Sequence, residues 1–309
     1  KYDAGEKIQL VRFVEGETIT VSGPVTSRAW DGNIGGVVAI LGADSVKLNS
    51  NINVSNQGFR GGAMPSQNYG GNCRYDMSAT VKDTLYFLPA ETGRSGYKGE
   101  GVVTAAWPYT MGTAFNYSGG GAGNGRYSGG GGGSNYNEGG NGGYQAAFCN
   151  NLLSVSGGWR GEGCFELYLD SAKIVMGGGG GSGTRMASAT ASPGGNGGGI
   201  VIIITGTLVG NGGSILASGQ SATSTTGSGG GGGAGGTVLI DAGSYSGSPI
   251  PVQIRGGNGG STLGTGTNCT GSGGGGSGGI IWHAGSSMPA VIDSAAGLRG
   301  NVTCFEQSG

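Results

Sequence analysis

Runs of consecutive glycines, several of which lead to a short stretch of β-branched residues, are the feature that most restricts what this chain can fold into. Such runs lie at Gly129–Gly133, Gly177–Gly181, Gly229–Gly233 and Gly273–Gly276. Strand-like strings follow glycine-rich tracts, namely IVIII (200–204), TVLID (237–241) and IIWHA (280–284). Glycine makes up 78 of the 309 residues, a proportion that usually indicates low complexity or collagen. A flexible linker has no need of Val and Ile at these places, so we expect the glycine to be structural.

The overall composition excludes several classes of protein. Charged residues make up 11% of the chain and are nearly balanced, with 16 basic and 17 acidic side chains. Disordered segments combine low hydrophobicity with high net charge, whereas 35% of these residues are hydrophobic and the net charge is −1. Collagen needs glycine at every third position and abundant proline, and only 8 prolines are present. The basic residues are scattered singly, so we expect no nucleic-acid partner, and no apolar stretch is long enough to predict a membrane span.

Five cysteines and one histidine set the expectations for disulfides and metals. The cysteines contain no C-x-x-C pair, so we expect no zinc site, and His283 leaves few other metal ligands. An oxidising extracellular environment would allow up to two disulfides. Cys149–Cys164 is the favoured pair because the loop between them is short, and Cys269–Cys304 comes second. The alternative is that all five cysteines are buried thiols.

No active site is indicated by the sequence. A glycosidase needs two convergent carboxylates, and no spacing pairs the acidic residues of this chain. A Ser/His/Asp site would have to use His283, which lies in the string IIWHA and is better explained as a structural or solvated residue. We therefore predict that the chain is not an enzyme and uses no cofactor or metal. A carbohydrate-active β-helix enzyme is the least favoured alternative.

A repeat of strand-like segments predicts the fold class. Similar blocks begin with Gly-Gly and an apolar string at Gly35, Gly198, Gly235 and Gly278. The last three are about 40 residues apart, a period typical of repeat architectures, and short strands without helical periodicity indicate an all-β protein. We predict a right-handed parallel β-helix-like solenoid without significant helix, in which IVIII, LVG and SILAS of one block occupy successive faces. KIQLVRFV, ETITVSG and VTSRAW, within residues 7–30, would add strands, and ETITVSG would cap one end.

The glycine-rich excursions between the strands are predicted to be ordered. Glycine lets two backbones approach closely, and runs such as GGGGGSG can form extended polyproline II or polyglycine II helices, which rise ~3.1 Å per residue and contain no internal hydrogen bonds. Their amides must then bond to neighbouring chains. We therefore expect a glycine layer packed beside the strands. The alternative is that the runs are loose surface loops, because ordering glycine is entropically unfavourable.

Residues 63–176 interrupt the repeat and divide the chain into regions. Residues 1–62 would hold the capping strands and the first repeat, 63–176 a Tyr/Gly-rich insertion, and 177–309 the remaining solenoid repeats. Most tyrosines lie in the insertion, many of them beside glycine or small polar residues, a composition favoured on binding loops. The candidate ligand-binding residues are Tyr69, Tyr97, Trp107, Tyr109, Tyr127, Tyr136 and Trp159. The alternative is that the tyrosines cover the glycine layer and shield its amides from water.

Ordered blocks along nearly the whole chain resemble a known family. The string KIQLVRFVEGETITVSGPVTSRAWDGNIGGVVAI is followed by INVSNQGFRGG, and GGAGGTVLID and GGGGSGGIIW come later. The corresponding positions are Val11–Phe13, Ala29–Gly32, Gly35–Val37, Gly58–Gly62, Gly198–Ile204, Gly232–Asp241, Gly256–Gly260 and Gly273–Trp282. These blocks are similar to segments of very large secreted cell-surface adhesins of gliding Bacteroidetes, which are related to the gliding-motility adhesin and exported by type IX secretion.

The resemblance implies an extracellular adhesin module at the cell surface, and it transfers no catalytic or binding residue. We expect the module to contact a cell surface, a glycan or another surface ligand through the Tyr-rich loops. We also expect it to belong to a longer polypeptide with further domains. A second hypothesis is a phage or filament tip adhesin built on a polyglycine II sandwich, in which loops between the glycine runs recognise a receptor.

Overall fold

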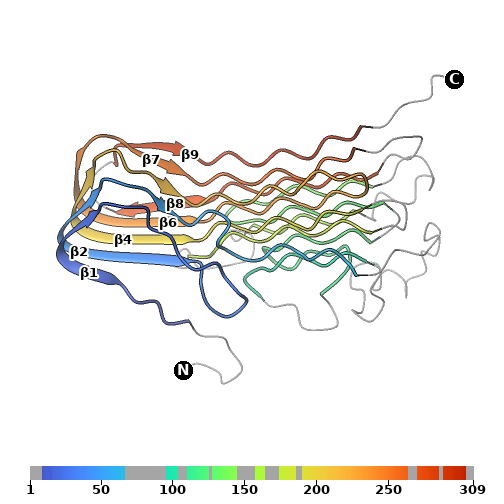
Figure 1. Cartoon of the computed structure of the whole chain (residues 1–309), viewed down its shortest axis with the longest axis horizontal. Helices are drawn as coiled ribbons and strands as arrows, with labels where there is room; N and C mark the ends of the chain where they lie inside the picture. The colour runs from blue at the N-terminus through green and yellow to red at the C-terminus, as the bar shows by residue number, and fades with distance from the viewer. Residues whose placement is uncertain are drawn as a thin grey trace.

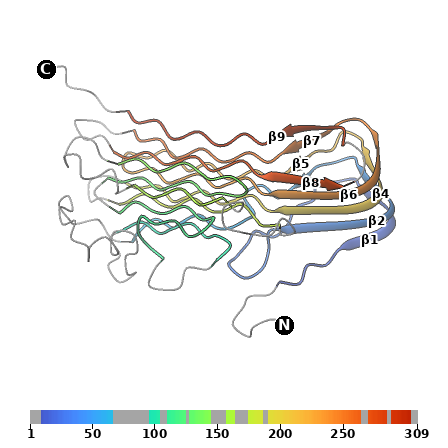
Figure 2. The same ribbon diagram turned by 180° about the vertical axis from the view of Figure 1, so that it is seen from behind.

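The computed structural model describes residues 9–66, 95–103, 110–124, 127–144, 157–163, 174–185, 190–263, 270–284 and 288–303. Within these ranges the regular elements are all β-strands and no helix occurs, which confirms the predicted all-β class. Figure 1 shows the strands gathered at one end of an elongated molecule, with glycine-rich segments running from them toward the other end; Figure 2 shows the same arrangement from behind. The described ranges also contain no helix with the length and apolarity needed to cross a bilayer.

Two parallel β-sheets make up the strand end. The first has five strands in the order β1-β2-β4-β6-β8, with the bounds β1 Val14–Val21, β2 Val37–Leu48, β4 Ile200–Gly210, β6 Thr237–Gly247 and β8 Ile280–Ala284. The second has four strands in the order β3-β5-β7-β9, with the bounds β3 Ile52–Asn53, β5 Ile215–Leu216, β7 Ile250–Gln253 and β9 Ala290–Asp293. From β2 onward, each strand of the first sheet is followed in the chain by a strand of the second. We call each such strand pair a coil.

Apolar side chains stack in register from one coil to the next. In the first sheet Ile40 pairs with Ile203, and Ile203 pairs with Ile240. In the second sheet Ile52 pairs with Ile215. These side chains belong to one buried cluster that includes residues from both sheets. Burying an aliphatic side chain of this size stabilises a fold by about 1.5–3 kcal/mol, so the hydrophobic contribution to stability is concentrated at the strand end.

The strands differ from the predicted arrangement in two places. IVIII and LVG were expected on separate faces, but both lie in the single strand β4. The chain does not turn at Gly206, because β4 keeps its register with β6 on both sides of it. The register shift opposite Gly206 lies in β2, between Gly42 and Ser45, and glycine tolerates the close approach to the Asp44 carbonyl oxygen there. Of the three N-terminal strings, ETITVSG contributes most of β1, which pairs with β2 at the edge of the first sheet, while Val25 makes only an isolated bridge to Ile52.

The glycine-rich segments are joined laterally by backbone hydrogen bonds that repeat every third residue. In the segment 177–183, successive N–H groups donate in turn to three different neighbours. Gly177, Gly180 and Gly183 donate to Gly198, Gly195 and Ser192, respectively, on the first neighbour. Gly178 and Gly181 donate to Ser134 and Gly131 on the second. Gly179 and Ser182 donate to Glu100 and Tyr97 on the third, and all N···O distances are 2.8–3.1 Å. Every third N–H of this segment therefore donates to the same neighbouring segment.

Segments from all parts of the chain join the same lattice of hydrogen bonds. Gly130 and Gly133, in the middle region, donate to Gly229 and Gly232, at 2.9 Å in both cases. We call the glycine-rich segments of this connected set the glycine bundle. It comprises residues 58–62, 96–101, 119–123, 129–134, 139–143, 157–161, 177–183, 192–198, 227–236, 256–260, 271–279 and 297–300.

Close packing of these segments explains why glycine fills them. A Cβ atom added at Gly180 would overlap the carbonyl oxygen of Gly231, and one added at Gly181 would overlap that of Gly121. In both cases the obstacle is backbone, which cannot rotate away as a side chain can. Any other residue at these points would have to push two segments apart and lengthen their hydrogen bonds.

Gly180→Ala is therefore expected to destabilise the protein by about 3 kcal/mol or more, since it overpacks a site bounded by backbone. Gly23→Ala is the matched control, because a Cβ at Gly23 meets no atom within 4 Å, and its effect should stay within about 1 kcal/mol. Thermal and denaturant unfolding followed by circular dichroism measures both. Equal stability of the two variants would contradict the close packing described here.

Candidate functional site

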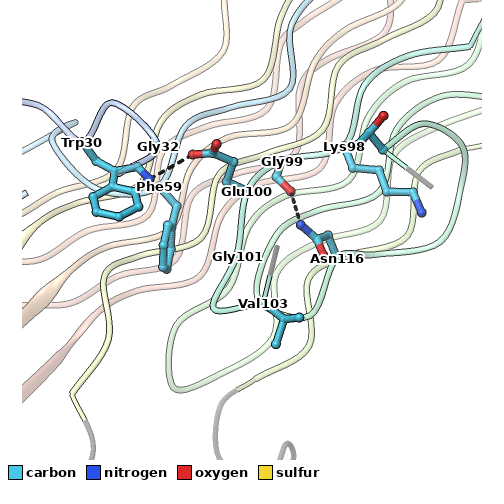
Figure 3. A pocket seen from close by; sticks show the side chains of 10 residues that line it. Trp30, Gly32, Phe59, Lys98, Gly99, Glu100, Gly101, Val103 and Asn116 are labelled. Carbon is cyan, nitrogen blue, oxygen red and sulfur yellow. Dashed lines mark hydrogen bonds between the residues drawn. The ribbon is translucent and has the colours of Figure 1, made fainter. Parts of the chain in front are cut away.

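Two surface hollows combine aromatic and charged side chains, and both lie at the glycine bundle. The first, which we call the Trp30 hollow, has a volume of about 130 Å³ and is lined by Trp30, Gly32, Phe59, Lys98, Gly99, Glu100, Gly101, Val103, Thr110 and Asn116 (Figure 3). The second, the Trp159 hollow, has a volume of about 310 Å³ and is lined by Phe115, Asn141, Trp159, Arg160 and Glu162.

A tight turn after Trp30 holds its ring in the first hollow. The Asp31 carboxylate accepts hydrogen bonds from the N–H groups of Asn33 at 2.9 Å and Ile34 at 3.0 Å. These bonds, that of Ile34 first, hold the pKa of Asp31 below its usual value. The Trp30 ring meets Phe59 edge to face, with ring centroids 5.9 Å apart and an interplanar angle of 88°. An edge-to-face pair of this kind adds about 0.5–1.5 kcal/mol beyond simple burial.

Glu100 ties the walls of the Trp30 hollow together. Its carboxylate accepts hydrogen bonds from Trp30 Nε1 at 3.1 Å and from the Arg60 backbone N–H at 3.1 Å, and it forms an ion pair with the Arg60 guanidinium. The hydrogen bond to Glu100 is the main reason that the pKa of Arg60 is raised. Asn116 Nδ2 donates to the Gly99 carbonyl at 3.3 Å, as Figure 3 shows. Because these polar groups bond to one another, the hollow acts as a joint between the first coil and the glycine bundle.

Lys98 is the most unusual charged residue of the Trp30 hollow. It is only 7% exposed, and burial lowers the pKa of its amine to about 7. Figure 3 shows its side chain directed away from Trp30 and Phe59. Its amine therefore changes charge near neutral pH inside the folded protein.

The Trp159 hollow is built on backbone that belongs to the glycine bundle. The Trp159 N–H donates to the Thr113 carbonyl at 2.8 Å, and its carbonyl accepts from Gly121 at 2.7 Å. The Trp159 and Phe115 rings lie 6.4 Å apart with an interplanar angle of 34°. The Glu162 N–H donates at 2.8 Å to the carbonyl of Tyr117, a residue that is 44% exposed. Backbone hydrogen bonds thus fix the chain at both Trp159 and Glu162.

The charged groups at the Trp159 hollow are partly neutralised. The Arg160 guanidinium forms an ion pair with Glu138, and both side chains are partly exposed. The Arg160 N–H donates to Asn141 Oδ1 at 2.9 Å, which orients the Asn141 amide at the edge of the hollow. The side chains that line it therefore offer a tilted aromatic pair together with amide, guanidinium and carboxylate groups.

The predicted ligand-binding residues that the structure describes lie on different segments rather than at one point. Trp159 lies in the hollow that bears its name, whereas Tyr97 and Tyr136 are half-buried. Tyr127 is 5% exposed, and its carbonyl accepts from Gly271 at 2.7 Å. Tyr69, Trp107 and Tyr109 lie outside the described residues. So do the disulfide candidates Cys149, Cys164, Cys269 and Cys304.

Several residues of the two hollows were not singled out from the sequence. Trp30 and Glu100 are brought together from positions 70 residues apart in the chain, and no local pattern links them. Trp159 and Glu162, in contrast, are three residues apart, so a three-residue period would have placed both on one face. His283 lies on β8 and is exposed, in agreement with a solvated role.

Neither a metal centre nor a known relative defines the function. The described residues contain no group of three or more His, Cys, Asp and Glu side chains placed to hold a metal ion. Comparisons of the chain with protein-family models, curated proteins and solved structures find no significant match. The function is therefore inferred from the chemistry of the two hollows and of the bundle that carries them.

The buried amine of Lys98 predicts a pH-dependent stability. The amine has a pKa of about 7 in the folded state and 10.5 as its ordinary value, so between these values the unfolded chain binds more protons than the folded one. The free energy of unfolding should then rise with pH over this window, by at most about 1.4 kcal/mol per pH unit. Lys98→Met should remove the rise and stabilise the protein at pH 7. Denaturant unfolding from pH 7 to 9.5 tests this, with Lys47→Met, a half-buried lysine on β2, as the control that keeps the rise.

Proposed function

We propose that this chain is an extracellular adhesin module that binds a glycan or another ligand on a cell surface and has no enzymatic activity. The observation that carries the proposal is the half-buried aromatic pair Phe115–Trp159, which lies beside hydrogen-bonding side chains on a hydrogen-bonded scaffold. Aromatic faces pack against the apolar C–H patches of sugar rings, and amide and carboxylate groups hydrogen-bond to hydroxyls. As an adhesin, it would work at the cell surface as part of a longer polypeptide.

Binding explains the pairing of Glu100 and Glu138 better than catalysis does. A glycosidase keeps two carboxylates free to act on one bond. Here Glu100 is engaged by Trp30 and Arg60, and Glu138 is paired with Arg160. Carboxylates held in this way position their neighbours, which suits a rigid binding surface.

We further propose that the coils form a right-handed parallel solenoid and that the glycine segments are polyglycine II helices. Support comes from the parallel pairing of every strand in both sheets. It also comes from hydrogen bonds that change neighbour with a period of three residues. In this arrangement the sheets anchor the module at one end, and the bundle holds the binding surface away from them.

Two kinds of adhesin fit this architecture. The sequence blocks resemble modules of the surface adhesins of gliding Bacteroidetes, which would place the chain on a bacterial surface. The lateral bonding of middle and C-terminal glycine segments into one bundle favours the second kind, a phage or filament tip adhesin built on a polyglycine II sandwich. In either case the chain contacts a cell-surface receptor or glycan.

Saturable binding to intact bacterial cells or to immobilised glycans is the expected outcome for the purified full chain. Fluorescently labelled protein would be applied to a panel of Gram-negative strains and to a glycan array, with binding measured by flow cytometry and array fluorescence. Loss of cell binding after periodate treatment identifies a glycan ligand, and loss after protease treatment identifies a protein receptor. Absence of binding to every strain and every glycan would contradict the adhesin assignment.

A further inference from the structure

The Trp159 hollow presents its two principal side chains from one face of a segment with three residues per turn. Gly158 and Gly161 donate to Gly129 and Gly132, at 2.9 and 2.8 Å, on one side of the segment. Trp159 and Glu162 occupy the next position of the same three-residue period, and their N–H groups bond to Thr113 and Tyr117 at 2.8 Å. An aromatic ring and a carboxylate therefore line the hollow at a separation fixed by backbone geometry.

The size of the Trp159 hollow suits one small, compact ligand. Its volume of about 310 Å³ lies at the small end of the range for ligand pockets, about 300–1,000 Å³. One wall is formed by the Trp159 and Phe115 rings, which are inclined to each other by 34°. The electron-rich face of an aromatic ring attracts the slightly positive C–H groups of a saturated ring, so this wall fits the apolar face of a pyranose.

The charges around the Trp159 hollow select against an acidic ligand. Among the described residues that line it, Arg160 is the sole cation, and its guanidinium is paired with Glu138. Glu162 adds a second carboxylate on the same side of the molecule. Two carboxylates against one guanidinium leave a negative local charge, and a like charge placed beside a carboxylate is unfavourable. A uronic or sialic acid is thus opposed, whereas the hydroxyl of a neutral sugar can donate to Glu162.

Asn141 supplies the complementary donor. Its Oδ1 atom accepts from the Arg160 N–H at 2.9 Å, which leaves the amide NH₂ directed elsewhere as a donor. A donor amide and an acceptor carboxylate in the lining of one hollow match the donor and acceptor capacity of adjacent hydroxyl groups. The aromatic wall contacts one face of the bound sugar ring, and the two polar groups bond to its hydroxyls.

We propose that the Trp159 hollow is a subsite for a single neutral hexopyranose residue of a surface glycan, stacked on Trp159 and hydrogen-bonded to Glu162 and Asn141. This inference rests on the proposed adhesin function and names the ligand class of its candidate site. The Trp30 hollow has no part in it, because its carboxylate is already bonded to Trp30 and Arg60.

The test compares neutral with acidic monosaccharides on the full chain. The probes are the methyl glycosides of glucose, galactose and mannose, and the methyl glycosides of glucuronic acid and N-acetylneuraminic acid, with binding measured by saturation-transfer NMR and tryptophan fluorescence. At least one neutral glycoside should bind and the acidic ones should not. Trp159→Ala should weaken neutral-sugar binding by about tenfold or more, while Trp159→Phe should keep part of it. Trp282→Ala, which removes a half-buried tryptophan of β8 at the sheet end, is the control that should leave binding unchanged.

Glu162→Gln separates recognition from a general loss of folding. It should weaken neutral-sugar binding several-fold and allow glucuronic acid to bind, because it removes one of the opposing negative charges while preserving shape. Thermal unfolding of every variant shows whether the fold is intact. Preference of the wild type for an acidic sugar, or unchanged affinity in a folded Trp159→Ala variant, would overturn the subsite. If the wild type binds cells but no neutral hexoside, the subsite fails and the adhesin function stands; if it binds neither cells nor glycans, both fail.

Discussion

Hydrogen bonds between the backbones of neighbouring glycine segments are the interaction on which the rest of this molecule depends. A buried N–H without a partner is strongly unfavourable, and the N–H groups of these segments donate to neighbouring segments rather than within their own. Each segment must therefore be surrounded by others at close range, and only chains without Cβ atoms can approach that closely at so many points. Where side chains do enter the bundle they take part in the same bonding: Asn135 donates from Nδ2 to the Gly235 carbonyl at 2.8 Å, and its N–H donates to Ser277 Oγ at 2.9 Å.

The sheets supply what the bundle lacks. Glycine segments bury little apolar surface and lose much conformational entropy when ordered, so hydrogen bonding alone offers small net stability. The coils contribute a continuous apolar cluster. Backbone hydrogen bonds at the start of the strands also fix the alignment of the adjoining glycine segments. Gly199, Gly236 and Gly279, which lie just before or at the start of β4, β6 and β8, donate to the carbonyls of Val54, Ala217 and Ile254 at 2.7–2.8 Å. The strand end can thus be regarded as the template that sets the alignment of the segments emerging from it.

How much of this arrangement could be predicted depends on whether side chains encode it. The β-branched residues that follow glycine at Ile200, Thr237 and Ile280 predict strands. All three residues begin strands of the first sheet. The lateral partners of Gly130 and Gly131 could not be predicted, since two identical residues bond to different neighbours, Gly229 and Gly121. The contacts among Trp30, Arg60 and Glu100 could not be predicted from the sequence either, because they form only when segments far apart in the chain are aligned. Trp159 was predicted as an aromatic contact residue, but its companions Phe115 and Asn141 become visible only through the packing of separate segments.

The three-residue period of the hydrogen bonds has a consequence for changes in chain length. Removing a single residue from a segment such as 177–183 turns everything beyond the deletion by a third of a turn, so that N–H groups formerly directed at one neighbour now face another. Removing three residues restores the facing of every donor and only shortens the segment. Segments of this kind can therefore change in length by three residues at a time and keep the same neighbours. The far end of the bundle can therefore be shifted in steps of three residues while each segment keeps the same lateral neighbours.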